Sequence, residues 1–330
     1  MGLDLVKYSE FLLDNGIELF AVATVEEAVI LRQAGIQKDI LMLSEVIEED
    51  EIETLIKHNI IFTIGSLEEK NIIDALSQKL NIIAKAHIKI DTGFARYGFL
   101  YTEKENILEA LKNTQNLKII GMFTHFSKAI NEKWTKLQFK RFKQCIELVD
   151  ENLFANNEFI FHCANTTAAL KYPEMKLNAV RVGSGIQGRV LKEFVNLGFK
   201  KVGYLQTQVT KTKTLPKGYN VSYSNEFKTK KETEIAVIPV GYMDGINIKN
   251  QRDSFNLKNN ILSVLIEIKK IFKKTKFKVR IRNSSYNVIG RYGMYHSIID
   301  VTGANIETKD DVTLEVAPIY INSNVRREYI

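Results

Sequence analysis

The stretch IIFTIGSLEEKNIIDALSQKLNIIAKAHIKI, residues 60–90, decides the fold. Its two ends are short apolar runs rich in β-branched residues, which are typical of buried strands. Between them, residues 66–79 carry apolar side chains at helical spacing, and Ser66 is a good capping residue with two acids in the first turn after it. A strand, a helix and a second strand in this order predict a β–α–β unit with two parallel strands.

The same alternation continues in both directions, from the start of the chain to about residue 198. We expect Thr24, Ser44, Ser66 and Thr102 to cap four of the helices. The first element, residues 4–15, is a helical pattern, and an α/β barrel closes with eight strands. We therefore expect residues 1–198 to form a TIM-type α/β barrel that lacks its first strand. The strand-like runs lie at 19–23, 40–43, 60–64, 82–90, 119–126, 159–163 and 179–183.

The rest of the chain, residues 199–330, has a different texture, in which strand-like runs and turn residues dominate. One stretch, residues 261–274, is the exception and reads as a helix or as a long insertion between strands. We expect a mainly β C-terminal domain over 199–330. Its strand-like runs lie at 204–215, 219–227, 234–242, 279–302 and 310–321.

Composition excludes several classes of protein. With 330 residues, 45% hydrophobic residues and only two Cys, the chain is neither disordered nor a disulfide-stapled secreted domain. The sequence has no run of about 18 apolar residues and no signal-peptide pattern at its start, so we expect a soluble cytoplasmic protein without a membrane partner.

The formal net charge of +7 invites a nucleic-acid interpretation. Residues 199–330 hold 23 basic and 12 acidic residues, so the excess lies there, largely in the lysine-rich stretch 253–282. No recognised nucleic-acid motif surrounds this stretch. We interpret it as a solvated lysine-rich face and expect no nucleic-acid partner.

Polar residues recur where the predicted barrel strands end, which is where barrels place their catalytic groups. They are Lys89, Asp91 and Arg96, then His125, His162 with Asn165, and Arg181 with Gly183. A metal site is one alternative, but no tight ligand spacing supports it. A dinucleotide cofactor is not favoured either, because no GxGxxG follows an early strand. The turn Gly183-Ser184-Gly185 instead favours a phosphate-anchored cofactor, because small residues let backbone N–H groups approach a phosphate.

Seven motifs resemble, in order, those of the pyridoxal-phosphate-dependent alanine racemases. The family pairs an N-terminal α/β barrel with a C-terminal β domain, as expected above, and the resemblance runs from residue 2 to the end. The motifs are KIDTGFARYGF (89–99), GMFTHFSKA (121–129), HCANTTAAL (162–170), VRVGSGIQGR (180–189), VSYSNEF (221–227), VGYMDG (240–245) and VIGRYGMYHSIIDVT (288–302).

The resemblance implies catalytic roles for two residues. Tyr223 matches a tyrosine that accepts a proton on one face of the substrate and is supplied across the interface of a homodimer. An ordinary tyrosine has a pKa near 10, so Tyr223 needs a cationic neighbour, and His125 is placed to help. Arg181 matches the arginine that faces the pyridine nitrogen of pyridoxal 5'-phosphate and keeps it unprotonated, which suppresses side reactions.

The remaining roles implied by the resemblance concern binding. Arg96 and Met294 match contacts to the carboxylate of the amino-acid substrate, and Lys89 resembles a lysine that is carbamylated to hold that arginine. Tyr242 belongs to the motif at the entrance of the active site. The positions that match cofactor and phosphate contacts are Asn165, Thr166, Gly183 and Ser184.

The implied activity is interconversion of L- and D-alanine through an imine of pyridoxal phosphate, which supplies D-alanine for peptidoglycan. This sequence differs from the family's pattern in two respects that bear on the implied activity. Gly293-Met294-Tyr295 and Ser323 replace residues common in the family, which leaves a racemase for serine or another amino acid open. The motif with the cofactor lysine would end where this chain begins, so we expect residues 1–330 to be inactive unless extended, and a non-catalytic relic or binding protein is the alternative.

Overall fold

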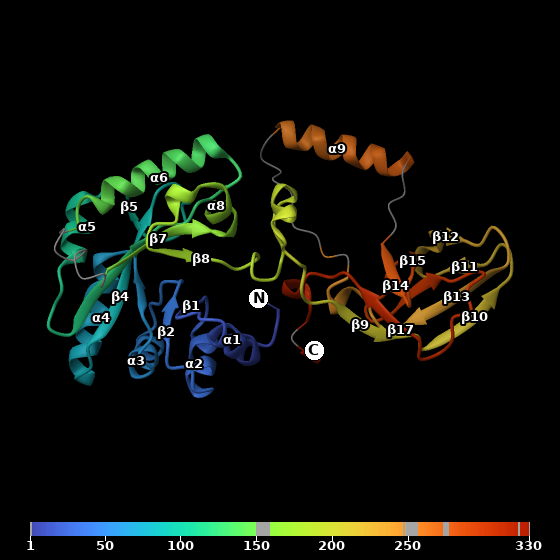
Figure 1. Ribbon diagram of the computed structural model, residues 1–330, viewed down its shortest axis with the longest axis horizontal. Helices are drawn as coiled ribbons and strands as arrows, with labels where there is room; N and C mark the ends of the chain where they lie inside the picture. Colours follow the sequence, from blue (N-terminus) through green and yellow to red (C-terminus); the bar gives the residue numbers. More distant parts are fainter. Residues whose placement is uncertain are drawn as a thin grey trace. The chain divides into compact units, whose positions relative to one another are not determined.

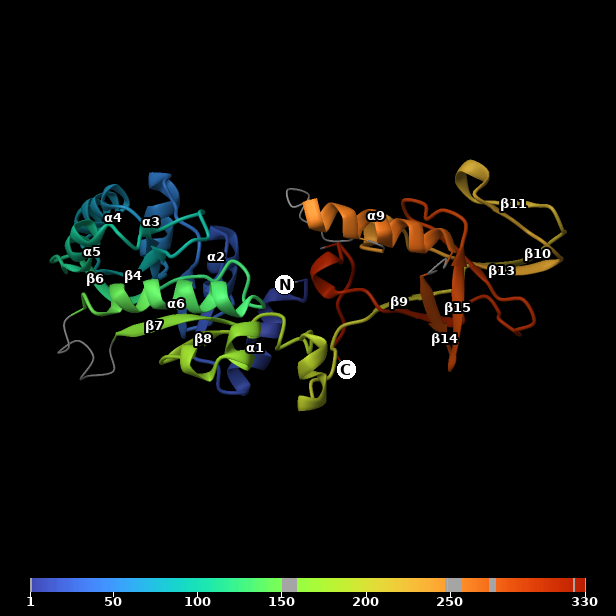
Figure 2. The same cartoon turned by 90° about the horizontal axis from the view of Figure 1, so that it is seen from above.

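The computed structural model describes residues 2–149, 159–246, 248, 257–272, 277–322 and 324–329 (Figures 1 and 2). It divides into two compact units. One is Asp4–Val202, and the other comprises Met1–Leu3 with Gly203–Ile330. The break after Val202 lies a few residues beyond the boundary expected at residue 198, and each unit has a hydrophobic core of its own.

Parallel strands in chain order form the inner layer of the first unit. They are β1 (Leu19–Val22), β2 (Asp39–Met42), β3 (Phe62–Ile64), β4 (Ala84–Asp91), β6 (Leu117–Phe123), β7 (Ile160–Asn165) and β8 (Ala179–Arg181), with the short β5 (Phe99–Leu100) beside β4. Strand β1 pairs with β2, a parallel bridge between Leu41 and Ile61 leads to β3, and the order then runs β3-β4-β6-β7-β8. This consecutive parallel order is the arrangement of a TIM-type barrel, as predicted.

Helices follow the strands and pack on them. They are α1 (Leu5–Asp14), α2 (Val25–Gln33), α3 (Glu49–Lys57), α4 (Leu67–Leu80), α5 (Lys104–Leu111), α6 (Glu132–Ile146) and α8 (Thr166–Lys171), with 3-10 turns η1 (Pro173–Met175) and η2 (Lys192–Leu197). Strand β4 is buried along nearly all of its length, and α4 contributes Ile73 and Leu76 to the same core. Burial of this apolar face holds the helix more firmly than its intrinsic propensity does.

Two of the four predicted helix caps are confirmed and two are wrong. The hydroxyl of Thr24 accepts the backbone N–H of Glu27, and that of Ser66 accepts the N–H of Glu69. Helix α3 begins only after Glu48 and α5 only after Glu103, so neither Ser44 nor Thr102 caps a helix. Ser44 lies two residues after the end of β2, and its hydroxyl donates to the Ala23 carbonyl instead.

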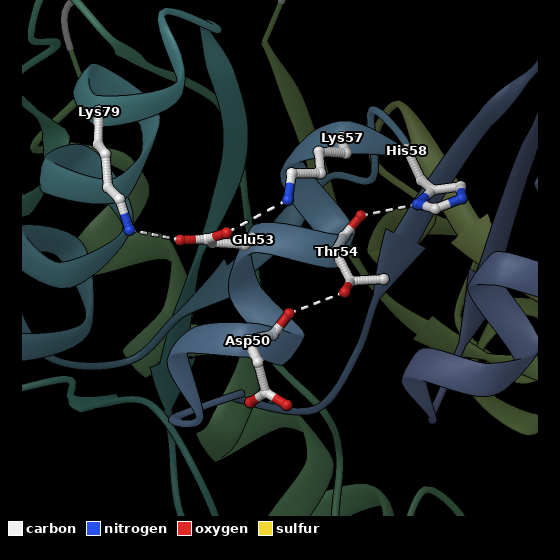
Figure 3. A network of polar contacts seen from close by, with 6 residues as sticks. All are labelled: Asp50, Glu53, Thr54, Lys57, His58 and Lys79. Carbon is white, nitrogen blue, oxygen red and sulfur yellow. Dashed lines mark hydrogen bonds and ion pairs between the residues drawn. The ribbon is translucent and has the colours of Figure 1, made fainter.

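A polar network on the outer surface joins α3 to α4 (Figure 3). Glu53 forms ion pairs with Lys57 on its own helix (3.2 Å) and with Lys79 on α4 (2.8 Å). The Thr54 hydroxyl donates to the carbonyl of Asp50, and the Thr54 carbonyl is 2.8 Å from Nδ1 of His58. Exposed ion pairs of this kind stabilise little, so this network orients the helices rather than driving their association.

The second unit is a mainly antiparallel β domain, as predicted. Its seven-stranded sheet has the order β10-β13-β16-β15-β14-β17-β9 among the described residues, and β11 pairs with β12. The strands are β9 (Leu205–Gln208), β10 (Lys211–Leu215), β11 (Asn220–Val221), β12 (Phe227–Lys228), β13 (Thr233–Ile238), β14 (Lys278–Ile281), β15 (Ser284–Ile289), β16 (Ser297–Asp300) and β17 (Asp311–Leu314).

Two predictions for this domain have different outcomes. The helical pattern at 261–274 is confirmed as α9 (Leu257–Phe272). Its last residues, 273–274, lie outside the described residues, as do 253–256 and 275–276 of the lysine-rich stretch. The run 219–227 is not one strand, because β11 ends at Val221 and the 3-10 turn η3 (Tyr223–Asn225) follows. Further 3-10 turns are η4 (Tyr242–Asp244) and η5 (Pro318–Tyr320).

The caps give a first testable prediction. Replacing Ser66 by Ala removes the acceptor for the Glu69 N–H and is expected to lower the free energy of unfolding by about 1 kcal/mol. Thr102→Ala is the matched control, because Thr102 is exposed and caps no helix, so its effect should stay within about 0.5 kcal/mol. Urea unfolding of both variants measures the difference, and equal losses would contradict the capping assignment.

Candidate active site

Side chains from neighbouring strands meet at one end of the barrel unit. Strand β4 contributes Lys89 and Asp91, the segment after β6 contributes His125, and Arg181 is the last residue of β8. Because parallel strands all end on the same side, these residues come together although they are far apart in sequence. A small pocket lies among them, lined by Lys89, Ile90, Asp91, Phe94, Arg96, Tyr97 and His125.

Arg181 makes the most contacts with this group. Its guanidinium donates to the backbone carbonyls of Thr124 (2.7 Å) and His162 (3.1 Å). It also contacts Nδ1 of His162 and Nδ1 of His125 (3.3 Å), and it lies over the Phe123 ring at 5.1 Å. Burial lowers the pKa of Arg181 to about 10, which leaves it charged at pH 7. All of these partners are neutral, so this set of contacts leaves the positive charge uncompensated.

His125 is neutral in this environment. Burial, followed by the positive charge of Arg181, lowers the pKa of His125 to about 4. Its Nδ1 faces the guanidinium, and the edge of its ring meets Phe94 with 5.6 Å between ring centroids. The role in helping Tyr223 that the resemblance implies for His125 stays a prediction. The cation is Arg181, and His125 is one of its hydrogen-bond acceptors.

Lys89 lies deeper in the pocket and is 5% exposed. Burial and then the charge of Arg96 lower the pKa of Lys89 to about 8. Its ammonium lies 4.9 Å from the centroid of the Tyr97 ring and 5.4 Å from that of Phe123. An amine in such a place is partly deprotonated near neutral pH, which is the state needed for covalent chemistry at nitrogen.

The loop after β4 is wound around the carboxylate of Asp91. One oxygen accepts the N–H groups of Gly93 (2.7 Å) and Phe94 (2.8 Å), and the other accepts that of Ala95 (2.9 Å). Ala95 adopts a left-handed conformation, with φ 58°, to close the turn. Arg96 follows, and its exposed guanidinium lies 4.6 Å from the centroid of the Phe94 ring. Asp91 therefore positions Arg96 at the surface of the pocket.

Glu45, which the sequence motifs did not single out, also acts on Lys89, and Glu69 acts on Glu45. Burial, and then the negative charge of Glu69, raise the pKa of Glu45 to about 7. Glu69 also accepts the Gly65 N–H at 2.8 Å. The position of Glu45 just after β2 could have indicated it, because it is the same kind of strand end that carries Lys89.

A second part of the site is a backbone cradle between β7 and β8. The hydroxyl of Thr166 accepts the N–H groups of Gly183 (3.3 Å) and Gly185 (3.2 Å), and Asn165 caps α8. A Cβ atom on Gly185 would lie 2.7 Å from the Thr166 methyl group, so only glycine allows this approach. A cavity of about 290 Å³ adjoins the cradle, lined by Thr166, Thr167, Leu170, Ser184, Arg189, Val190, Leu191, Phe194 and Lys201.

Tyr223 belongs to the β domain and is 68% exposed there. Left-handed backbone surrounds it, since φ is 66° at Ser222, 60° at Ser224 and 51° at Asn225. Such residues each cost about 1–3 kcal/mol and are commonest where function requires them. The Ser222 hydroxyl donates to the carbonyl of Arg291 at 2.5 Å and helps to hold the turn. The tyrosine is thus displayed on a rigid, strained turn rather than along a strand.

Tyr242 and Met294 lie side by side in the same domain. The N–H of Tyr242 donates to the Gly293 carbonyl at 3.1 Å, and a Cβ on Gly241 would lie 2.2 Å from the Met294 carbonyl oxygen. A Cβ atom added to Gly293 would lie 3.8 Å from the Tyr223 ring, so Gly293 is close to Tyr223. The structure therefore brings the three candidates of the β domain together, and the other candidates meet in the barrel unit. Ser323 lies outside the described residues.

Several other kinds of site are missing from the part of the chain that the structure describes. No three His, Cys, Asp or Glu side chains come together there as metal ligands, and none of the helices described is long and apolar enough to cross a membrane. Cys145 and Cys163 are buried thiols, and burial raises their pKa to about 11 and about 12. Neither thiol is an activated nucleophile.

Family sequence models match both units. The model described as "Alanine racemase, N-terminal domain" matches residues 1–189, and "Alanine racemase, C-terminal domain" matches residues 202–322. The chain belongs to the alanine racemase family.

Individual members of the family agree. The chain is 33% identical over 317 residues to the alanine racemase of Methanococcus maripaludis, covering 94% of this chain and 78% of that protein. It is 39% identical over 241 residues to that of Clostridium tetani, covering 71% of this chain and 61% of the relative. The fold resembles the alanine racemase structure from Clostridium difficile 630, with a TM-score of 0.80 and 28% identity over 96% of this chain and 77% of that one.

The structure from Bacillus anthracis, which contains bound L-Ala-P, is similar as well. It gives a TM-score of 0.77 and 25% identity, covering 97% of this chain and 78% of that one. These likenesses confirm the predicted pairing of an α/β barrel with a β domain. They also place the chain in a family whose named members are isomerases.

The charges around Lys89 give the second testable prediction. Arg96 lowers the pKa of Lys89 and Glu45 raises it, so Arg96→Gln should move that pKa upward and Glu45→Gln should move it further down. Titration of ¹³C-methylated lysines by NMR measures both shifts. Glu132→Gln, an exposed carboxylate on α6 of the same unit, is the charge-matched control and should leave Lys89 unchanged. Shifts in the same direction for both pocket variants would contradict the assignment.

Proposed function

We propose that this protein is an alanine racemase that acts with pyridoxal 5'-phosphate. The observation that carries the proposal is the charged guanidinium of Arg181 at the end of β8. The hydrogen-bond acceptors that contact it among the described residues are all neutral, and it lies close to the backbone cradle at Thr166. A fixed cation two residues before a glycine-rich turn suits an anionic cofactor. Family membership supports the same conclusion.

The residues present fit this cofactor. Thr166, Gly183 and Ser184 would hold its phosphate, and the close packing that requires glycine at residue 185 supports a site built for backbone contacts. Arg181 would donate to the pyridine nitrogen and keep it unprotonated. When bound, pyridoxal phosphate withdraws electrons from the α-carbon of an amino acid and so makes its proton removable.

We also propose that Arg96 binds the substrate carboxylate. Its guanidinium is exposed at the pocket, while the Asp91 loop keeps its backbone in place. Arginine suits this role because its planar group donates two parallel hydrogen bonds to a carboxylate. Lys89 beneath it would be carbamylated, since a lowered pKa leaves neutral amine to react with CO2, and the carbamate would pair with Arg96.

Racemisation requires a base on each face of the α-carbon, and we propose Tyr223 as one of them. It is the exposed residue of a strained turn, so its hydroxyl can face the surface of another molecule. We infer a homodimer in which Tyr223 of one copy serves the barrel site of the other. The product would be D-alanine, which is used in peptidoglycan.

The test of this function is conversion of L-alanine to D-alanine in the presence of pyridoxal phosphate, followed by chiral chromatography. None of residues 1–330 matches the motif that carries the family's cofactor lysine. The assay therefore compares residues 1–330 alone with the same residues extended by the corresponding segment of the Clostridium tetani protein. We expect conversion by the extended chain and no trappable imine in the shorter one. Faster conversion of serine would correct the substrate, and no conversion of any amino acid would favour a non-catalytic binding protein.

Tyr223→Phe is expected to slow proton removal from one enantiomer by about 10²-fold or more, because it removes the hydroxyl that accepts the proton. Binding of the cofactor should be unchanged. Measuring α-deuterium exchange separately from L- and D-alanine reveals the asymmetry. Tyr219→Phe, another exposed tyrosine of the β domain, is the control and should behave like the unaltered protein. Full rates in both directions for Tyr223→Phe would remove this residue from the mechanism.

A further inference from the structure

Two histidines lie in direct contact inside the barrel, beneath Arg181. Nδ1 of His87, on β4, is 2.8 Å from Nε2 of His162, on β7, and their ring centroids are 5.1 Å apart. Both side chains are buried, with exposures of 0% and 1%. His162 in turn contacts the guanidinium of Arg181 through its Nδ1. The three residues form a continuous chain from the core to the end of β8.

The donor and the acceptor of each hydrogen bond between Arg181, His162 and His87 can be assigned without ambiguity. Arginine has only donors, so Nδ1 of His162 must accept and carries no proton. A neutral His162 then has its proton on Nε2 and donates it to Nδ1 of His87. His87 in turn carries its proton on Nε2. That last nitrogen is buried and has no hydrogen-bond partner among the described residues. One tautomer of each ring is therefore required by the contact with the guanidinium.

Charge considerations support neutral rings. Burial first, and then the charge of Arg181, lower the pKa of His87 to about 3, and the pKa of His162 is lowered for the same two reasons. A second cation at either ring would repel the guanidinium in surroundings of low dielectric constant. A neutral acceptor, by contrast, orients the guanidinium without cancelling its charge.

The rings are also held in place by packing. His162 stacks on Phe123, with ring centroids 4.8 Å apart and planes 9° from parallel. A Cβ on Gly121 would lie 2.7 Å from three atoms of the His87 ring, so the ring occupies space that only a glycine on β6 leaves free. Neither imidazole can turn without disturbing a neighbouring strand.

We propose that His87 is a positioning residue for Arg181, acting through His162. By accepting the Nε2 proton of His162, it strengthens His162 as an acceptor and fixes the orientation in which Arg181 presents its charge at the strand ends. Outer partners of ligand histidines act in this way, by orienting the ring and raising its basicity. The importance of that charge for catalysis rests on the proposed function, whereas the hydrogen-bond chain itself does not.

The test uses NMR of protein labelled with ¹⁵N-histidine, which is readable because the chain has only five histidines. His162 is expected as the Nε2–H tautomer. His87→Asn keeps an acceptor close to the position of Nδ1 and should leave the His162 signals nearly unchanged. His87→Leu removes the acceptor and should shift both His162 nitrogens. His58→Asn, at the end of α3, is the control and should change neither. An Nδ1–H tautomer, or unchanged His162 signals in folded His87→Leu, would overturn the proposal.

Kinetics of the active protein provide a second measurement. His87→Leu should lower kcat by about tenfold with little change in KM for alanine, because Arg96 and not Arg181 holds the substrate carboxylate. His87→Asn should recover most of the loss. If His87→Leu does not fold, Gly121→Ala, which pushes the His87 ring away, replaces it in both measurements. If the unaltered protein shows the expected NMR tautomers but no racemase activity, only the proposed function is refuted. If His87→Leu keeps a normal kcat, the positioning role is refuted.

Discussion

The arrangement of the site depends on one buried cation, the guanidinium of Arg181. Moving a charge away from water is costly, and the usual remedy is a carboxylate partner. Here the recorded partners are two carbonyl oxygens and two imidazole nitrogens. They satisfy the N–H groups but leave the charge available to a ligand. Burial first, and then repulsion from the guanidinium, lower the pKa of His125 and His162 and keep both rings neutral.

Within each of the two units, backbone geometry holds side chains that meet solvent. Arg96 is carried by a loop wound around Asp91, and Tyr223 by a turn with left-handed backbone on both sides. In both places the side chain is exposed while its backbone is constrained. A constrained backbone of this kind lowers the entropy that a side chain loses when it binds a partner. The Thr166 cradle works in the same way, since the hydroxyl holds the N–H groups of Gly183 and Gly185 in one orientation.

The predicted helix caps were right where the capping residue lies directly before the helix. Ser66 and Thr24 lie directly before a helical pattern and are caps, whereas Ser44 and Thr102 lie farther from their helices and are not. A capping residue recognised by its type alone does not reveal where the chain turns. Likewise, the run around Tyr223 alternates like a strand, but contacts with the neighbouring segment at Arg291 bend it into a 3-10 turn.

The sequence by itself determined the alternation of strands and helices, the β character of the second domain, and the candidate residues at the strand ends. These follow from hydrophobic periodicity and from motifs, which are local properties. Only the tertiary structure decided the charge states and partners. The neutrality of His125, the raised pKa of Glu45, and the contact of His87 with His162 depend on burial and on groups distant in sequence. Electrostatic interactions are set by distances in space, and a linear pattern does not contain them.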